Sequence, residues 1–177
     1  MECILTQEYK SPIGVLLLGA YKNQICVCDW KYRKQRKRID ERICQHLNAQ
    51  YQPGSSDMLT KLALQLDEYF NGERQTFDVD YIFCGSAFQK EVWNQLLQIK
   101  VGSWISYQQL ALQCGDAQKV RAVASANGAN ALAIIVPCHR VLASDGKLTG
   151  YAGGLRAKQY LLKLENAYQP SLQGTLF

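Results

Sequence analysis

Long apolar runs and prolines are both scarce in this chain, and their scarcity excludes several classes of protein. No apolar run approaches the roughly 20 residues that a membrane-spanning helix needs, so we expect a soluble protein without a membrane partner. The 177 residues include 4 Pro and 13 Gly, with 47% apolar and 20% charged residues. This composition excludes collagen, coiled coil and intrinsic disorder, and it leaves a globular protein of one large or two small domains.

Histidine is scarce as well, and a secretory signal is missing. The chain has 2 His, and its closest cysteine pair, Cys26 and Cys28, has the wrong spacing for a zinc knuckle, so we expect no metal and no cofactor. Residues 1–10 carry Glu2 and Glu8 and lack a basic segment followed by an apolar one, which predicts a cytoplasmic protein. In that compartment the 7 Cys are expected to be reduced thiols.

Positive charge is unevenly distributed along the chain. Residues 1–86 hold 11 Lys/Arg and 11 Asp/Glu, whereas residues 87–177 hold 9 Lys/Arg and 4 Asp/Glu. The net charge of +5 therefore lies in the second half, which indicates a polyanionic partner for that half. A separate cluster of six Lys/Arg in residues 31–38 is interpreted as a solvated loop or the start of a helix.

The first half is predicted to be a small α/β domain. Short β-rich segments at residues 3–9, 13–20 and 24–30 are separated by turn signals, which predicts hairpin-linked strands of an antiparallel sheet. Apolar residues at helical spacing predict a helix over residues 57–70, with Asp57 as its N-cap. Residues 76–83 are expected to be extended. We place the domain boundary at residues 84–86, which gives domains 1–85 and 86–166 and a tail, 167–177.

The second half is predicted to be mostly helical, with helices over residues 87–99, 106–114, 117–127 and 155–165. The two central helices and the tight turn between them are typical of a helix-turn-helix. The second of these helices is rich in small residues such as Ala122 and Ser125 and is poor in side chains that read base edges. It could approach a minor groove closely, or it could pack tightly in the core.

Candidate chemistry is concentrated in the segment Pro137-Cys138-His139-Arg140. The β-favouring residues 134–136 precede it, so we expect a buried strand that ends in Pro-Cys and presents one sulfur rigidly. The thiolate is the nucleophilic form of cysteine, and a neighbouring base or cation favours it, so His139 and Arg140 could activate Cys138. The other six cysteines are interpreted as small buried hydrophobic residues.

The run Pro-Cys-His-Arg-Val at residues 137–141 resembles the signature of the O6-alkylguanine-DNA alkyltransferases, a family of direct-reversal DNA repair proteins. The resemblance extends over residues 86–166, at Gly102, residues 105–110, residues 121–123, Asn130, residues 150–155, Lys158, Leu161, Leu162 and Glu165. The first half matches only in general layout. The resemblance implies an α+β fold in which a ribonuclease H-like domain supports a helical DNA-binding domain.

The resemblance also implies roles for individual residues. Cys138 would accept the alkyl group irreversibly, His139 would take the thiol proton through a water molecule, and Glu165 would orient the imidazole. Tyr107 would donate a proton to the leaving guanine at N3. Asn130 would tie the helix-turn-helix to the active-site turn.

The implied partner is double-stranded DNA that contains an alkylated guanine, with O4-alkylthymine left open as a second substrate. The damaged base lies inside the stack and must be flipped out to reach a buried sulfur. Arg121 would fill the space that the base leaves. The loop over residues 144–154, which begins with Ser144, would wall the pocket. In it, Tyr151 would flank the base, and the backbone of Cys138, Val141 and Ala152 would read its edge. Ala152 stands where the family often has Ser.

The chain ends in Gln-x-x-Leu-Phe, and this tail resembles short peptides that dock on bacterial sliding clamps. Leu176 and Phe177 would fill an apolar pocket of the clamp, next to a contact from Gln173. The alternative is that both apolar residues fold back on the protein itself. We otherwise expect a monomer.

Two other functions stay open at this point. One is a DNA-binding protein that flags alkylated bases without transfer chemistry. The other is a cysteine hydrolase that uses Cys138, His139 and Glu165, which would require an oxyanion hole.

Overall fold

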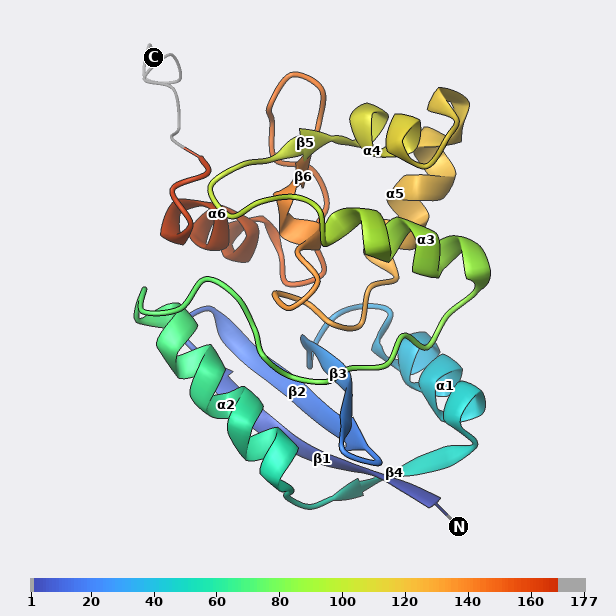
Figure 1. Cartoon of the computed structure of the whole chain (residues 1–177), viewed down its shortest axis with the longest axis vertical. Coiled ribbons are helices and arrows are strands. Elements are labelled where there is room, and N and C mark those ends of the chain that lie inside the picture. Colours follow the sequence, from blue (N-terminus) through green and yellow to red (C-terminus); the bar gives the residue numbers. More distant parts are fainter. Residues whose placement is uncertain (1, 169–177) are drawn as a thin grey trace.

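The computed structural model describes residues 2–168, in which a sheet-containing half lies below a mostly helical half (Figure 1). The first half contains β1 (Glu2–Ser11), β2 (Gly14–Tyr21), β3 (Gln24–Trp30), α1 (Arg36–Leu47), β4 (Ala49–Pro53) and α2 (Asp57–Phe70). The second half contains α3 (Ala87–Leu96), β5 (Ile105–Ser106), α4 (Tyr107–Gln113), η1 (Ala117–Lys119), α5 (Val120–Gly128), η2 (Cys138–Arg140), β6 (Val141–Leu142) and α6 (Leu155–Leu164). None of the helices in this range is long and apolar enough to cross a bilayer.

The main sheet has the order β3-β2-β1-β4, and its first three strands are antiparallel, as predicted. Lys22 and Asn23 have φ values of 45° and 64°, which gives the β2–β3 hairpin the left-handed turn that fits a twisted sheet. The sequence analysis did not predict α1 or β4. β4 pairs with β1 in parallel, and α1 provides the crossover that a parallel pair requires.

The two helices of the first half cover opposite faces of the sheet. α2 packs through Leu59 and Leu62 against the face that carries Leu16, whereas α1 packs through Ile39 against the face that carries Ile4. Burial on both sides explains why β3 is apolar along nearly its whole length. The core on the α2 side continues into the second half through residues of α3, α5 and α6, so the two halves share one apolar cluster.

Polar side chains set the starts of three helices. The predicted N-cap of α2 is wrong by one residue: Ser56 is the N-cap and accepts a hydrogen bond from Leu59 N, because the Ser56 backbone is extended while Asp57 is already helical. Ser86 caps α3 through a capping box with Gln89. Ser106 forms the corresponding box at the start of α4, and this fixes the position of Tyr107 as its first helical residue.

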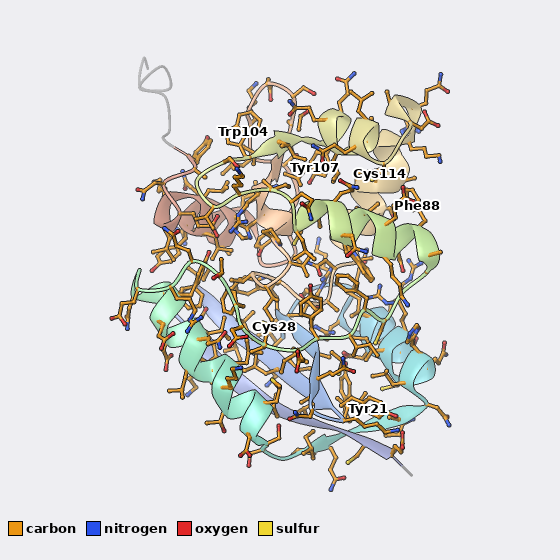
Figure 2. The ribbon with its side chains drawn as sticks, viewed as in Figure 1. Tyr21, Cys28, Phe88, Trp104, Tyr107 and Cys114 are labelled. Carbon is orange, nitrogen blue, oxygen red and sulfur yellow. The ribbon has the colours of Figure 1, made fainter. Side chains whose placement is uncertain are left out.

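The segment before the Pro-Cys motif is not the buried strand that we predicted. Residues 132–136 form a tight turn in which Val136 N donates to Leu132 O at 2.8 Å, and Ile134 has a φ of 72°. The turn is anchored on β3 because Ala133 N donates to the carbonyl of Cys28, which lies where the sheet meets the upper half (Figure 2). The apolar run reflects burial between the two halves rather than a strand.

Two of the six cations in residues 31–38 are fixed in place. Arg33 and Arg36 form ion pairs of 3.0 and 2.7 Å with Asp29 at the end of β3, and the Asp29 side chain is fully buried. α1 begins at Arg36, so the basic run is partly a loop and partly a helix start. The extended segment at residues 76–83 runs beside β3, where Ile25 N donates to Asp80 O and Ile82 N donates to Ile25 O.

Candidate active site

A groove of about 1300 Å³ is lined by the helix-turn-helix, by the loop that precedes α6 and by residues of α1 and the loop before it, and Cys138 lies at its floor. One wall carries Tyr107, the first residue of α4 (Figure 2), and Arg121 of α5. The other wall carries Tyr151 and Ala152. Cys138 is 5% exposed, so a ligand must enter the groove to meet its sulfur.

Asn130 holds the turn that presents Cys138. Its side-chain amide donates to Val136 O and its side-chain oxygen accepts from Leu132 N, both at 2.9 Å. Pro137 follows, and Cys138 N donates to Val136 O at 2.8 Å as the chain enters the short helix η2. Asn130 lies two residues after the end of α5, so its side chain connects the end of the helix-turn-helix to the turn that presents Cys138.

His139 and Glu165 form a buried pair. Nε2 of His139 lies 2.9 Å from Oε1 of Glu165, and the imidazole is fully buried. Because the carboxylate is an acceptor, Nε2 carries the proton and Nδ1 is an acceptor. Nδ1 has no hydrogen-bond partner among the described residues. Burial lowers the pKa of His139 against the opposing effect of Glu165, so the imidazole is neutral near pH 7 and can accept a proton.

Glu165 accepts hydrogen bonds from three side chains. Besides His139, Arg140 donates to both carboxylate oxygens at 2.8 and 3.0 Å, and Tyr69 of α2 donates to Oε1 at 2.6 Å. Burial alone would raise the pKa of Glu165, but His139 and Arg140 outweigh it and hold the pKa far below its ordinary value. Arg140 is therefore directed at Glu165 and not at the thiol, contrary to one expectation from the sequence.

The cation with the largest effect on the pKa of the thiol is Lys158 of α6. Its side chain is fully buried, and Nζ donates to Thr149 O at 2.9 Å and Gly150 O at 3.3 Å. Burial lowers the pKa of Lys158 to about 8. Burial also raises the pKa of Cys138, while Asn130 and Lys158 lower it. The raised pKa means that the resting group is a thiol, so the chemistry needs a base.

α5 has one buried face and one exposed face. The buried face packs in the core and the exposed face is free to approach a groove of DNA, so both interpretations of this helix apply, each to one face. Val123 and Ala126 are buried, and Trp93 Nε1 donates to Ala126 O at 2.8 Å. The exposed side carries Arg121 and otherwise only small residues, namely Ala122, Ser125 and Gly128. A surface of this kind allows close contact with a groove of DNA and has little capacity to read base edges.

Six of the ten predicted site residues line the groove, namely Tyr107, Arg121, Asn130, Cys138, Tyr151 and Ala152. His139 and Glu165 are buried and do not line it, and neither do Val141 and Ser144. Val141 is buried in β6, and Ser144 lies in an exposed turn. The ring of Tyr151 packs edge-on against Trp30 at 5.9 Å. Trp30 in turn lies so close to Gly153 that a Cβ atom there would be 2.4 Å from the indole, which explains the glycine.

Sequence reasoning missed three contributors. Tyr69 lies in a different half from the other site residues and carries no motif, and the pairing of Asp29 with Arg33 and Arg36 looked like part of a solvated basic run. Lys158 was recognised only as a position of the resemblance, without a role. Among residues 2–168, no group of three or more His, Cys, Asp or Glu is arranged to hold a metal ion.

The fold and the site define a class of protein: a nucleophilic thiol with a neutral imidazole and a carboxylate, at the floor of a groove beside a helix-turn-helix. Comparisons with known proteins agree with this class. Residues 4–80 match the family model "6-O-methylguanine DNA methyltransferase, ribonuclease-like domain", and residues 87–167 match the corresponding "DNA binding domain" model.

Individual relatives point to the same family. The chain is 40% identical over 156 residues to the methylated-DNA--protein-cysteine methyltransferase of Methanosarcina barkeri, which covers 88% of this chain and 93% of the relative. The crystal structure of the Mycobacterium tuberculosis O6-methylguanine methyltransferase has a TM-score of 0.77 at 37% identity, over 95% of this chain and 96% of the other. A structure of that protein in complex with DNA also has a TM-score of 0.77. The chain belongs to the 6-O-methylguanine DNA methyltransferase family, and it is a DNA-binding repair protein that transfers alkyl groups to cysteine.

Proposed function

We propose that this protein repairs O6-alkylguanine in duplex DNA by moving the alkyl group to the sulfur of Cys138. The observation that carries this assignment is the position of one buried thiol beside the His139–Glu165 pair, at the floor of a groove walled by α4 and α5. A thiolate is a soft nucleophile that attacks saturated carbon well, so the site suits alkyl transfer.

The reaction begins with deprotonation of the thiol. Nδ1 of His139 takes the Cys138 proton through a bridging water, and Glu165 stabilises the imidazolium that forms. The ammonium of Lys158 favours the thiolate, since it lowers the pKa of Cys138. The sulfur then forms a bond to the alkyl carbon while the bond between that carbon and O6 breaks. The products are a thioether and a guanine that leaves with the electron pair.

The leaving guanine needs a proton. Tyr107 lines the groove near Cys138, and its phenol donates that proton to N3 of the base. The tyrosine regains a proton from the imidazolium through solvent, so the net change is one alkyl group exchanged for one thiol hydrogen. The thioether is chemically stable, and each molecule therefore reacts once.

Access to the thiol requires a flipped base. Arg121, exposed on α5, enters the stack in place of the base, while Tyr151 and Ala152 enclose it in the groove. The roles proposed for Val141 and Ser144 are weaker: Val141 could contribute only backbone groups from β6, and Ser144 contributes only to the outer part of its loop.

Two alternative functions are less well supported. A protein that only flags lesions has no use for a thiol beside a His–Glu pair. A hydrolase needs backbone donors for an oxyanion, but the N–H groups of Cys138 and Arg140 already donate to Val136 O and Pro137 O. The relatives named above are methyltransferases.

The organisation that we propose has residues 1–85 as a support domain, residues 86–166 as the DNA-binding and transfer domain, and residues 167–177 as a tail. The protein would act as a monomer in the cytoplasm, associated with the nucleoid when bound to DNA. A contact of Gln173, Leu176 and Phe177 with a sliding clamp remains a prediction, and these three residues lie outside the described part of the chain.

The test is mass spectrometry of the protein after reaction with a duplex that carries one O6-methylguanine. The proposal predicts that the tryptic peptide with Cys138 gains the mass of one methylene group. Cys138→Ala should bind the duplex without repairing it, and the matched variant Cys3→Ala, at an exposed position outside the groove, should react as wild type. Repair of the guanine with Cys138 unmodified would refute the assignment.

A further inference from the structure

The basic run before and within α1 contains two cations that the fold itself does not use. Arg33 and Arg36 are paired with the buried Asp29. Lys34 and Arg38, in contrast, are exposed and take part in none of the ion pairs or side-chain hydrogen bonds found among residues 2–168. Both line the same groove that has Cys138 at its floor. Because Lys34 and Arg38 make no such contact within the described part of the fold, both side chains are available to bind a ligand.

An aromatic side chain lies beside these two cations. Tyr32 is 78% exposed, the largest exposed fraction among the large apolar side chains of residues 2–168, and the ammonium of Lys31 lies 5.1 Å from its ring centroid. Exposed basic side chains interleaved with an aromatic ring are typical of surfaces that bind nucleic acid. The acidic residues of this part of the groove are already neutralised, since Asp29 is paired with two arginines and Glu41 lies 3.9 Å from Lys37.

This surface is held rigidly next to α5. Arg33 donates to the carbonyls of Gly128 and Asn130, and Arg42 of α1 donates to Ala129 O at 2.8 Å. Three consecutive carbonyls at the C-terminal end of α5 are thus bound by arginines from the first half. DNA that lies along the exposed side of α5 and continues past Gly128 therefore meets the loop before α1 next.

We propose that Tyr32, Lys34 and Arg38 form an accessory DNA-binding surface that contacts the sugar-phosphate backbone beyond the segment covered by the helix-turn-helix. The inference rests on the proposed function, because the ligand is the same lesion-bearing duplex. Lys34 and Arg38 each neutralise a phosphate, and Tyr32 packs against the neighbouring sugar. The contact carries no sequence information, and it increases affinity on longer DNA.

The experiment measures binding of a lesion-bearing duplex of about two helical turns as a function of salt, using Lys34→Ala and Arg38→Ala. Each variant should bind several-fold more weakly at low salt, and the slope of log affinity against log salt should decrease by about one. The matched control is Lys10→Ala, because Lys10 is exposed in β1, takes part in none of the ion pairs found among residues 2–168 and does not line the groove. This control should keep the wild-type affinity and slope.

Two further measurements distinguish failure of the accessory-surface proposal from failure of the proposed repair function. All variants should methylate Cys138 at the wild-type rate with the free nucleoside O6-methylguanosine, which has no phosphate for Lys34 or Arg38 to contact. If wild type alkylates Cys138 but Lys34→Ala and Arg38→Ala bind the long duplex with unchanged affinity and slope, the accessory surface is refuted and the repair function stands. If wild-type Cys138 remains unmodified, the repair function itself fails.

Discussion

The hydroxyl of Tyr69 donates a hydrogen bond of 2.6 Å to Oε1 of Glu165, across the boundary between the two halves of the molecule. Tyr69 is near the end of α2, and Glu165 follows α6. Burial and the adjacent Glu165 both raise the pKa of Tyr69, so the phenol remains a donor at all relevant pH values. The first half therefore supplies a direct contact to the His139–Glu165 pair in addition to mechanical support.

Tyr69→Phe tests this contact. The variant removes one donor from Glu165 and retains the buried ring, so the fold should persist. Loss of one hydrogen bond to a carboxylate costs about 1 kcal/mol, which corresponds to a roughly fivefold slower transfer if the bond orients Glu165 during the reaction. Single-turnover transfer and DNA binding should be measured in parallel. A purely structural role for Tyr69 would lower the melting temperature and leave the transfer rate of the folded protein unchanged.

The pH dependence of transfer follows from His139. Burial lowers the pKa of His139 below 6.5, although Glu165 partly opposes the shift. The imidazole must be neutral to accept the thiol proton, so below the pKa of about 8 at which Lys158 becomes protonated the rate should stay level to pH 6.5 and decrease only at lower pH. Rates measured from about pH 5 to pH 8 with saturating DNA would show this profile. An acid limb with its midpoint above 6.5 would contradict a neutral, buried base.

The free energy of unfolding should also decrease as the pH falls. Both His139 and Glu165 have a lower pKa in the folded protein than in the unfolded chain, so the unfolded chain binds more protons on acidification. The contribution of His139 is present above pH 6.5 and that of Glu165 above pH 4.5, and each is lost as the pH falls toward the folded value. Urea unfolding as a function of pH measures this loss, and a protein that gained stability between neutral pH and pH 5 would contradict it.

Asn130→Ala should damage both stability and transfer. The Asn130 side chain makes two hydrogen bonds of 2.9 Å, and its removal leaves Leu132 N and Val136 O without these partners in the buried turn that presents Cys138. Val136 O keeps its hydrogen bond from Cys138 N, so Leu132 N is the group left unpaired, at a cost of about 1–3 kcal/mol. Thermal unfolding and single-turnover transfer should both show a large loss. Asn94→Ala, at an exposed position of α3, is the control and should behave as wild type.

Local signals in the sequence predicted much of the fold, and they failed where long-range packing decides the conformation. The hairpin of β2 and β3 and the helix α3 depend on turn and capping residues within a few positions, and both are confirmed. Residues 134–136 were expected to be a strand because burial between two halves produces the same apolar run. β4 was not predicted, since its parallel pairing with β1 becomes possible only after α1 has reversed the chain.

In the candidate site, too, local motifs identified some residues, whereas contacts made by long-range packing were missed. Cys138, His139 and Asn130 lie within one short segment, so motif and spacing were sufficient to select them. Tyr69 reaches Glu165 only through packing of α2 against the second half, which no local pattern encodes. Arg140 was selected for its position next to the thiol, but the side chain turns away toward Glu165 because the buried carboxylate needs a cationic partner.

Lys158→Met tests the electrostatic part of the site. The Lys158 ammonium lowers the pKa of Cys138 against the larger effect of burial, so its removal should raise the pKa of the thiol. Alkylation by iodoacetamide, followed on Cys138 as a function of pH, should show a midpoint shifted to higher pH, and DNA repair near neutral pH should slow in parallel. Lys158→Arg should retain part of the effect, because it keeps a positive charge. Lys163→Met, on the same helix and outside the lining of the groove, is the matched control. An unchanged thiol midpoint in Lys158→Met would show that the lysine acts only by holding the carbonyls of Thr149 and Gly150 in place.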